Sequence, residues 1–182
     1  MMAHPAISFL RILDPNPSAR FGIETYTDVP KGENKPKPDR AGRQFNELSI
    51  DEVEDLLPKL ESINELGAGV FVAVNEFDGR RQKDNLFRVR GVHADLDGVD
   101  DQTLAKIRDI LPPTIEVQTS GRHNRHFYWL LEPGTTMDMI QAVQINRRLI
   151  ACGADPAATD ITRLLRLPGF KHMKNRGANP NA

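Results

Sequence analysis

The stretch 90-RGVHADLDGVDD-101 places two aspartates, Asp95 and Asp97, within an otherwise apolar segment. Side chains alternate between the faces of a β-strand, so both carboxylates are expected on one face, about 7 Å apart along the backbone. The opposite face is predicted to be buried and carries Val92, Ala94 and Leu96. Neighbouring carboxylates repel each other unless a cation lies between them, and oxygen-rich sites suit Mg²⁺ or Mn²⁺. The stretch therefore indicates either a divalent-metal site or a strand that ends in an Asp97-Gly98 turn.

Strands and helices are mixed around this stretch without regular alternation. Strands are predicted at 7–13, 21–28, 68–76, 89–96, 114–119 and 126–132. Helices are predicted from a Ser49–Glu52 capping box to about Leu66, from Asp100 or Asp101 to Leu111, and from Thr135 or Thr136 to Cys152. Pro58 is expected to kink or split the first helix, and a hairpin loop is expected around Asp78-Gly79. We predict an α+β fold, with a mixed, largely antiparallel sheet and flanking helices.

Composition excludes several classes of protein. The 182 residues suffice for one domain with a real core. A single cysteine, Cys152, excludes an internal disulfide and a cysteine-based zinc cluster. The sequence has no apolar run of about 18 residues, which predicts no membrane span, and its start lacks the apolar core of a signal peptide. We therefore expect a cytoplasmic protein.

The charge is unevenly distributed although the net charge is only −1. Residues 80–90 contain five basic residues and one acid, and no acid follows Asp160. Such runs can be solvated faces, or they can bind nucleic acid. Basic segments on both sides of the same aspartates favour the second interpretation.

Two further segments carry candidate chemistry. In 119-TSGRHNRHFYWLL-131 a small, basic turn between two strands could hold phosphate, or it could be an ordinary hairpin with surface histidines. In 155-DPAATDITRLLRLPGFKHMK-174, Asp160 precedes a basic and apolar segment. Asp160 could complete a two-metal site, or it could cap a helical turn.

Taken in order, the three segments resemble the motifs of the archaeo-eukaryotic primase superfamily, in particular its plasmid RepB-type and phage primase-polymerase members. The similar phrases are 64-NELGAGVFVAVNEFDG-79, 89-VRGVHADLDG-98, the segment from Thr119 to Glu132 and 160-DITRLLRLPGF-170. The resemblance runs from about Asn64 to Lys174. It implies an RRM-like catalytic core over residues 47–174, preceded by N-terminal strands and a mobile loop in residues 1–46 and followed by a tail, 175–182, all within one domain.

The resemblance also implies roles for individual residues. Asp95, Asp97 and Asp160 match the carboxylates that bind two divalent ions, Mg²⁺ or Mn²⁺. The residues that would hold the nucleoside triphosphate are Ser120, His126, Arg163, Arg166 and Lys171. His123 competes with His126 as the motif histidine, because the turn is about one residue longer than is usual in the family. The candidates for contacting the DNA template are Asn75, Arg80, Arg81, Lys83, Arg88 and Arg90.

The function implied by the resemblance is template-directed nucleotidyl transfer, by a primase or primase-polymerase, in the replication of a phage, plasmid or mobile element. Single-stranded DNA and NTP or dNTP would be its partners, with a replicative helicase fused or in trans. Two alternatives remain: a non-catalytic module that binds single-stranded or origin DNA, and a metal-dependent nuclease that uses the same carboxylates. Synthesis that depends on nucleotides and metal separates the first interpretation from both alternatives.

Overall fold

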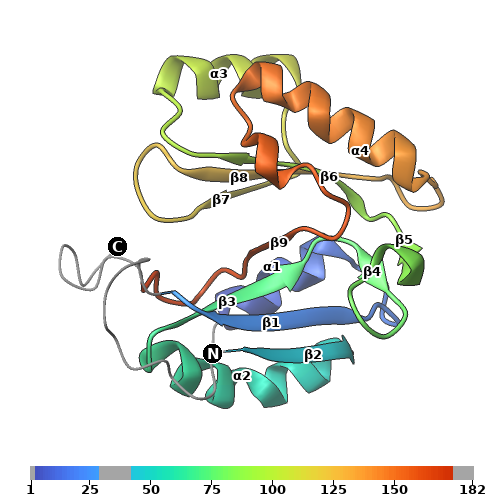
Figure 1. Cartoon of the computed structure of the whole chain (residues 1–182), viewed down its shortest axis with the longest axis vertical. Helices are drawn as coiled ribbons and strands as arrows, with labels where there is room; N and C mark the ends of the chain where they lie inside the picture. The colour runs from blue at the N-terminus through green and yellow to red at the C-terminus, as the bar shows by residue number, and fades with distance from the viewer. Residues whose placement is uncertain (1–2, 29–41, 174–182) are drawn as a thin grey trace. The chain divides into compact units, whose positions relative to one another are not determined.

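The computed structural model describes residues 3–28 and 42–173, and the chain divides into two compact units (Figure 1). Unit 1 consists of two segments, residues 1–73 and 164–182. Unit 2 is Val74–Arg163. Most of the predicted mobile loop and the C-terminal tail lie outside the described residues. The predicted α+β class and antiparallel pairing are confirmed. Instead of one sheet, however, the described strands form sheets of four, two and three strands.

Unit 1 contains the four-stranded sheet, in the order β2-β1-β3-β9. Its strands are β1 (Phe21–Thr27), β2 (Arg43–Leu48), β3 (Ala68–Ala73) and β9 (Leu164–Arg166). Its helices are α1 (Pro5–Leu13) and α2 (Ile50–Glu65), which contact each other. Strand β2, a polar strand that follows the predicted loop, was not expected from the sequence. Its pairing with β1, which places Gln44 opposite Glu24, forms only in the folded chain.

Residues 7–13 form most of helix α1, so the strand predicted there is wrong. The run is apolar without alternation, and such short runs do not separate a strand from a buried helix. Pro5 occupies the first turn, where its missing N–H costs nothing, and the His4 side chain accepts a hydrogen bond of 3.2 Å from the Ala6 amide. The buried residues of α1 are Ala6, Ile7, Phe9, Leu10 and Leu13, which is a helical spacing.

Helix α2 begins at the predicted capping box. The Ser49 amide donates to Glu52 Oε2 at 2.7 Å, and the Glu52 amide donates to Ser49 Oγ at 3.3 Å. Pro58 lies inside this continuous helix, so the predicted split does not occur. Its ring deprives the Glu54 carbonyl of a hydrogen bond, but both residues are exposed, so water can solvate that carbonyl. The helix ends near Leu66 as predicted, and Gly67, with φ 103°, follows it.

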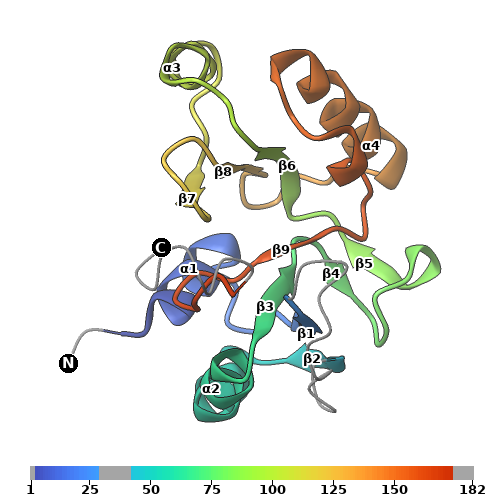
Figure 2. The ribbon, with the colours of Figure 1, turned by 60° about the vertical axis from the view of Figure 1, so that its left-hand side comes forward.

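Unit 2 consists of a short hairpin and a three-stranded sheet with two helices. The hairpin is β4 (Glu76–Phe77) and β5 (Leu86–Arg88), and the sheet has the order β6-β8-β7. The sheet and helices are β6 (Gly91–Leu96), α3 (Asp101–Ile110), β7 (Ile115–Gln118), β8 (Arg125–Leu130) and α4 (Met139–Arg148). Figure 2 shows α3 and α4 over the same face of this sheet. Asp100 caps α3 by accepting from the Thr103 amide at 2.7 Å, as one of the two predicted caps.

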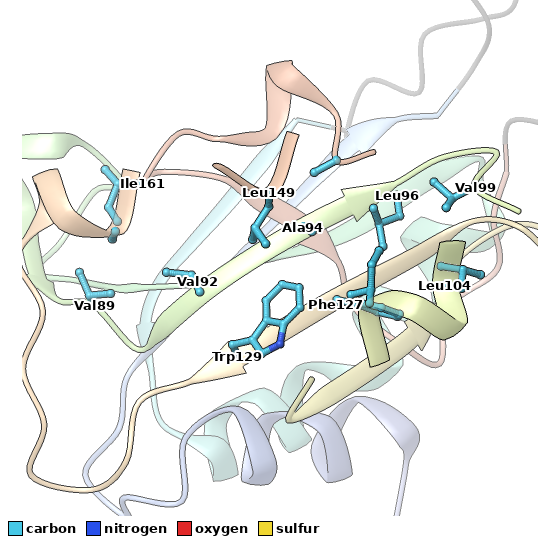
Figure 3. Close-up of a cluster of buried hydrophobic side chains, with 13 residues drawn as sticks. Val89, Val92, Ala94, Leu96, Val99, Leu104, Phe127, Trp129, Leu149 and Ile161 are labelled. Carbon is cyan, nitrogen blue, oxygen red and sulfur yellow. The ribbon is translucent and has the colours of Figure 1, made fainter. Parts of the chain in front are cut away.

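The core of unit 2 lies between this face of the sheet and the two helices (Figure 3). Val92, Ala94 and Leu96 are buried in it, which confirms the buried face predicted for the opening stretch. On the paired strand, Phe127 and Trp129 occupy the same core and contact each other edge to face, with ring centroids 6.0 Å apart. The other face of β6 and β8 is therefore the one that carries Asp95 and the residues around it.

Two predictions in unit 2 need correction. The hairpin loop expected around Asp78-Gly79 implies pairing of the predicted strands 68–76 and 89–96, but the loop joins β4 to β5, and β6 pairs with β8. Sequence proximity suggested the wrong partner, because pairing is decided by tertiary contacts. Helix α4 begins after Asp138 and not after Thr135 or Thr136. Asp138 and Gln141 form a reciprocal capping box there, with hydrogen bonds of 2.8 and 3.2 Å.

In the described part of the chain, no helix is both long and apolar enough to cross a membrane.

Candidate active site

The antiparallel register of β6 and β8 places Asp95 directly opposite His126. His126 Nε2 lies 3.4 Å from Asp95 Oδ1, and the His126 side chain is only 6% exposed. The competing candidate, His123, lies in the turn before β8, where its Nδ1 is 3.9 Å from an Asp101 carboxylate oxygen. Of the two predicted motif histidines, His126 is therefore the one that the structure brings to Asp95.

Arg163 approaches the same carboxylate from the segment before β9. Its Nη2 lies 3.9 Å from Asp95 Oδ2. Burial of the Asp95 carboxyl favours its neutral form, but the hydrogen bond and charge of His126 and the charge of Arg163 outweigh this effect. The pKa of Asp95 consequently lies below its ordinary value, and the group is a carboxylate at neutral pH.

His93 was not singled out from the sequence, although it shares the parity of Asp95 in the strand. It is 1% exposed, and its Nε2 lies 2.9 Å from the Ala158 carbonyl oxygen. Burial lowers the pKa of His93 to about 4, so the ring is neutral near pH 7 and its Nε2–H donates to this carbonyl. Strand parity was the available signal, because every second residue from Asp95 lies on the same face.

Asp97 lies one residue beyond the end of β6 and is exposed. The chain turns there: Gly98 has φ 68°, and its amide donates to Asn124 Oδ1 at 2.8 Å. The structure thus contains the turn that the sequence suggested as an alternative to a metal site. An exposed carboxylate at a turn remains chemically able to bind a cation, so the turn leaves the metal prediction standing.

Asp160 lies in the segment that leads to β9. Its Oδ1 accepts hydrogen bonds from the Thr162 amide at 2.7 Å and from the Thr162 hydroxyl at 2.6 Å. Its Oδ2 is 3.5 Å from Lys83 Nζ. Burial tends to raise the pKa of Asp160, but the bonds from Thr162 and the charge of Lys83 bring it below the ordinary value. One carboxylate oxygen of Asp160 therefore stabilises a local turn, and the other lies beside the ammonium group of Lys83.

The carboxylates are the oxygen donors that Mg²⁺ and Mn²⁺ prefer, and by type they suit such a centre. Among residues 3–28 and 42–173, however, no three His, Cys, Asp or Glu side chains are grouped closely enough to hold a metal ion together. The arrangement seen is instead one carboxylate, Asp95, between two basic side chains, and another, Asp160, beside a lysine.

The turn between β7 and β8 is held by its own side chains. Ser120 Oγ accepts from Asn124 Nδ2 at 2.8 Å, and Arg122 forms an ion pair of 2.5 Å with Asp101. Arg125 binds Glu116 at 3.0 Å. Ser120 remains a predicted phosphate contact, whereas Arg122 and Arg125 already have acidic partners.

Arg166 and Lys171 belong to unit 1. Arg166 Nη2 donates to Asp28 Oδ1 at 2.8 Å, and its guanidinium carbon lies 5.0 Å from the centre of the Phe71 ring. The backbone of Lys171 exchanges two hydrogen bonds of 2.9 Å with the side chain of Asn64. Nucleotide binding by either residue stays a prediction.

We expect the Asp28→Asn substitution to lower the free energy of unfolding by about 3 kcal/mol near neutral pH, because it breaks a buried ion pair. Burial raises the pKa of Asp28, but the hydrogen bond and charge of Arg166 and the Met173 amide more than offset it, so the pKa is lowered. The stabilisation is therefore complete above the unfolded value of about 3.9 and disappears as the pH falls through the lower folded value. Urea unfolding followed by circular dichroism between pH 7 and 3 should show the variant and wild type converging in acid. A constant gap across this range would contradict the assignment.

Most of the predicted template contacts form hydrogen bonds or ion pairs with other residues of unit 2. Arg81 Nη1 donates to the Thr162 carbonyl at 2.6 Å, and Lys83 pairs with Asp160. Arg88 and Arg90 lie 2.6 and 3.4 Å from Glu76. Of the other two candidates, Asn75 is buried, and Arg80 is exposed in the hairpin loop.

The family described as RepB DNA-primase N-terminal domain matches residues 73–182. Among solved structures, primase RepB′ is similar at 23% identity and a TM-score of 0.66, over 93% of this chain and 50% of that chain. The AEP domain of the cyanophage S-2L primase-polymerase has 21% identity and a TM-score of 0.64, over 92% and 83% of the two chains. The catalytic domain of RepB′ in complex with initiator DNA has 22% identity and a TM-score of 0.64, over 94% and 78%.

These structural similarities establish the fold, and the chain spans half the length of primase RepB′. The comparison with curated proteins found no match. The family match covers the segments that carry Asp95, His126 and Asp160, and it confirms the resemblance seen in the sequence. The chain belongs to the RepB DNA-primase N-terminal domain family.

Proposed function

We propose that this chain catalyses template-directed nucleotidyl transfer on single-stranded DNA, with Mg²⁺ or Mn²⁺ as cofactor. The observation that carries the proposal is the position of Asp95 between His126 and Arg163, on the face of the β6-β8 pair that points away from the core. Membership of a DNA-primase family supports the same chemistry.

Asp95, Asp97 and Asp160 are the residues proposed to hold the metal ions. Bound ions would supply the positive charge that activates a 3′-hydroxyl group and stabilises the leaving pyrophosphate. The depressed pKa values of Asp95 and Asp160 support this role, because both groups are ionised and ready to bind a cation at neutral pH.

His126 and Arg163 are proposed to bind the triphosphate. His126 Nδ1 and Arg163 Nε are buried and have no hydrogen-bond partner among the described residues. Buried polar atoms without a partner are costly and suggest that a ligand satisfies them. Phosphate oxygens are suitable acceptors for both groups, and charge-assisted bonds to phosphate are strong. Ser120, Arg166 and Lys171 complete the proposed set of nucleotide contacts.

The template is proposed to lie along the basic hairpin of unit 2. Arg80 is the best candidate, since it is exposed and lies in the loop of that hairpin. A similar solved structure is described as a complex with initiator DNA, which supports DNA binding by this fold. Contacts of this kind are largely electrostatic, so binding should weaken as salt is raised.

The primary test is primer synthesis on single-stranded DNA, with Mg²⁺ or Mn²⁺ and with ribo- and deoxyribonucleotides supplied separately. We expect labelled nucleotide to be incorporated only when template, divalent metal and nucleotide are all present, and EDTA should abolish the product. Absence of product under every combination of metal and nucleotide would contradict the proposal.

Template binding without synthesis is the second candidate, and a solved complex of a similar catalytic domain with initiator DNA supports the binding part of it. It predicts a complex with single-stranded DNA and no incorporation with either metal. Degradation of DNA in the absence of nucleotides would instead indicate a nuclease.

A further inference from the structure

The segment 157–163, here called the third-motif segment, carries Asp160 and Arg163 but is mostly irregular. It begins within the short helix Pro156–Ala158 and ends at Arg163, the residue before β9. Irregular backbone lacks the hydrogen-bond ladders of helices and sheets, so each buried carbonyl needs a partner of its own. In this segment all seven carbonyl oxygens have one.

The partners come from many parts of unit 2. Two carbonyls bind backbone amides: Asp160 O accepts from the Arg163 amide at 3.1 Å, and Arg163 O accepts from the Val74 amide at 3.3 Å. The other five accept from side chains. These donors, in the order of the carbonyls from Ala157 to Thr162, are Arg163, His93, Asn146, Asn75 and Arg81, at distances of 3.1, 2.9, 3.4, 3.0 and 2.6 Å.

Asn75 and Asn146 each connect the segment to a second stretch of backbone. Asn75 donates to the Ile161 carbonyl and accepts from the Arg90 amide at 2.9 Å. Asn146, on α4, donates to the Thr159 carbonyl and accepts from the His93 amide at 3.0 Å. Both asparagines are 1% exposed. An asparagine side chain is short, so one that forms hydrogen bonds with two stretches of backbone fixes the distance between them.

We propose that Asn75, Arg81, His93 and Asn146 are positioning residues that hold the third-motif segment, and with it Asp160 and Arg163, in place for catalysis. This inference rests on the proposed function. It changes the interpretation of Asn75 and Arg81, which the sequence suggested as template contacts: their side chains donate to the protein backbone instead. Catalytic groups gain from such support, because small displacements of a reacting group cost large factors in rate.

A first test needs no catalysis. In the Asn146→Ala variant we expect amide hydrogen exchange to become at least about 10-fold faster in a peptide covering residues 155–163, because local opening becomes easier there. Peptides covering α3 and β8 should change much less. Leu104→Ala is the matched control: Leu104 is 1% exposed in α3 and touches the same core, so its loss should speed exchange in α3 first. Unchanged exchange in 155–163, or an equal increase in all peptides, would overturn the proposal.

A second test uses the adjacent pair Arg80 and Arg81. Arg81→Met should lower kcat for nucleotide incorporation by at least about 10-fold while the template Kd and its salt dependence stay unchanged, as a positioning role requires. Arg81→Lys keeps a donor and should recover much of the rate. Arg80→Met, at the exposed neighbour, should instead weaken template binding and reduce the salt slope by about one unit.

The outcomes separate the two proposals. If Arg81→Met weakens template binding and flattens its salt dependence as Arg80→Met does, Arg81 is a template contact and the positioning role is wrong. If the wild-type protein shows no synthesis, the proposed function fails, and hydrogen exchange in the Asn146→Ala and Arg81→Met variants alone decides whether these side chains hold the segment: faster exchange confined to residues 155–163 supports the positioning role, and unchanged exchange overturns it.

Discussion

The Asp95→Asn variant is expected to lose more than about 100-fold of its nucleotide incorporation while remaining folded. Asparagine keeps the size of the side chain and an oxygen that can accept from His126, but it lacks the charge that a metal ion and Arg163 require. Because Asp95 faces two basic groups, we also expect a loss of about 1–3 kcal/mol in the free energy of unfolding. Primer synthesis and urea unfolding of the same preparation measure the two effects.

Two other aspartates make this experiment decisive. Asp97→Asn should reduce incorporation strongly with little change in stability, because Asp97 is exposed at a turn. Asp109→Asn, at an exposed position on α3, should leave both quantities near wild type. An Asp95→Asn variant that retained most of its synthesis would show that this carboxylate does not serve the reaction.

The Gly91→Ala variant is expected to lose about 3 kcal/mol or more of stability, which is at the upper end for an overpacked site. A Cβ atom at Gly91 would lie 2.3 Å from the Trp129 carbonyl oxygen and 3.0 Å from Leu130 Cα. Both are backbone atoms of β8, the strand to which β6 is paired, so they cannot move aside without disturbing that pairing. Trp129 is the one tryptophan of the chain, so its fluorescence during urea unfolding reports on this strand.

Gly121→Ala is the matched control for this experiment. At that position the nearest atom to an added Cβ is Asn124 Nδ2 at 3.8 Å, an ordinary contact, and φ lies outside the left-handed region. Alanine should therefore be neutral or stabilise the protein by about 0.5 kcal/mol through the unfolded state. Equal unfolding midpoints for the two variants would contradict the close approach of β6 and β8 at Gly91.

Local features of the fold were predictable because they depend on neighbours in sequence. The Ser49–Glu52 capping box and the Asp100 cap each involve residues three apart, and both appear where expected. The alternation of β6 was predictable for the same reason. Prediction failed at residues 7–13, where an apolar run fits either a helix or a strand, and at β2, which needs β1 to be recognised.

Some features of the candidate site were also predictable from the sequence, and others were not. The residue types of Asp95, His126 and Asp160 are visible in the sequence, and the family they indicated is confirmed. Only the register of β6 and β8 shows that His126, and not His123, lies opposite Asp95. A shift of this register by one residue would turn His126 to the opposite face of the sheet. Lys83 is a candidate template contact by sequence, and only the fold places its Nζ 3.5 Å from Asp160 Oδ2.

The sequence by itself determined the family, the α+β class, and the parity that puts Asp95 opposite the core face of its strand. These properties follow from local spacing and from motifs read in order along the chain. Only the tertiary structure decided which strands pair, and that Asn75, Arg81, His93 and Asn146 donate to the third-motif segment. The reason is physical: an irregular backbone must find its hydrogen-bond partners wherever the fold brings them, and these four lie up to 86 residues away in sequence.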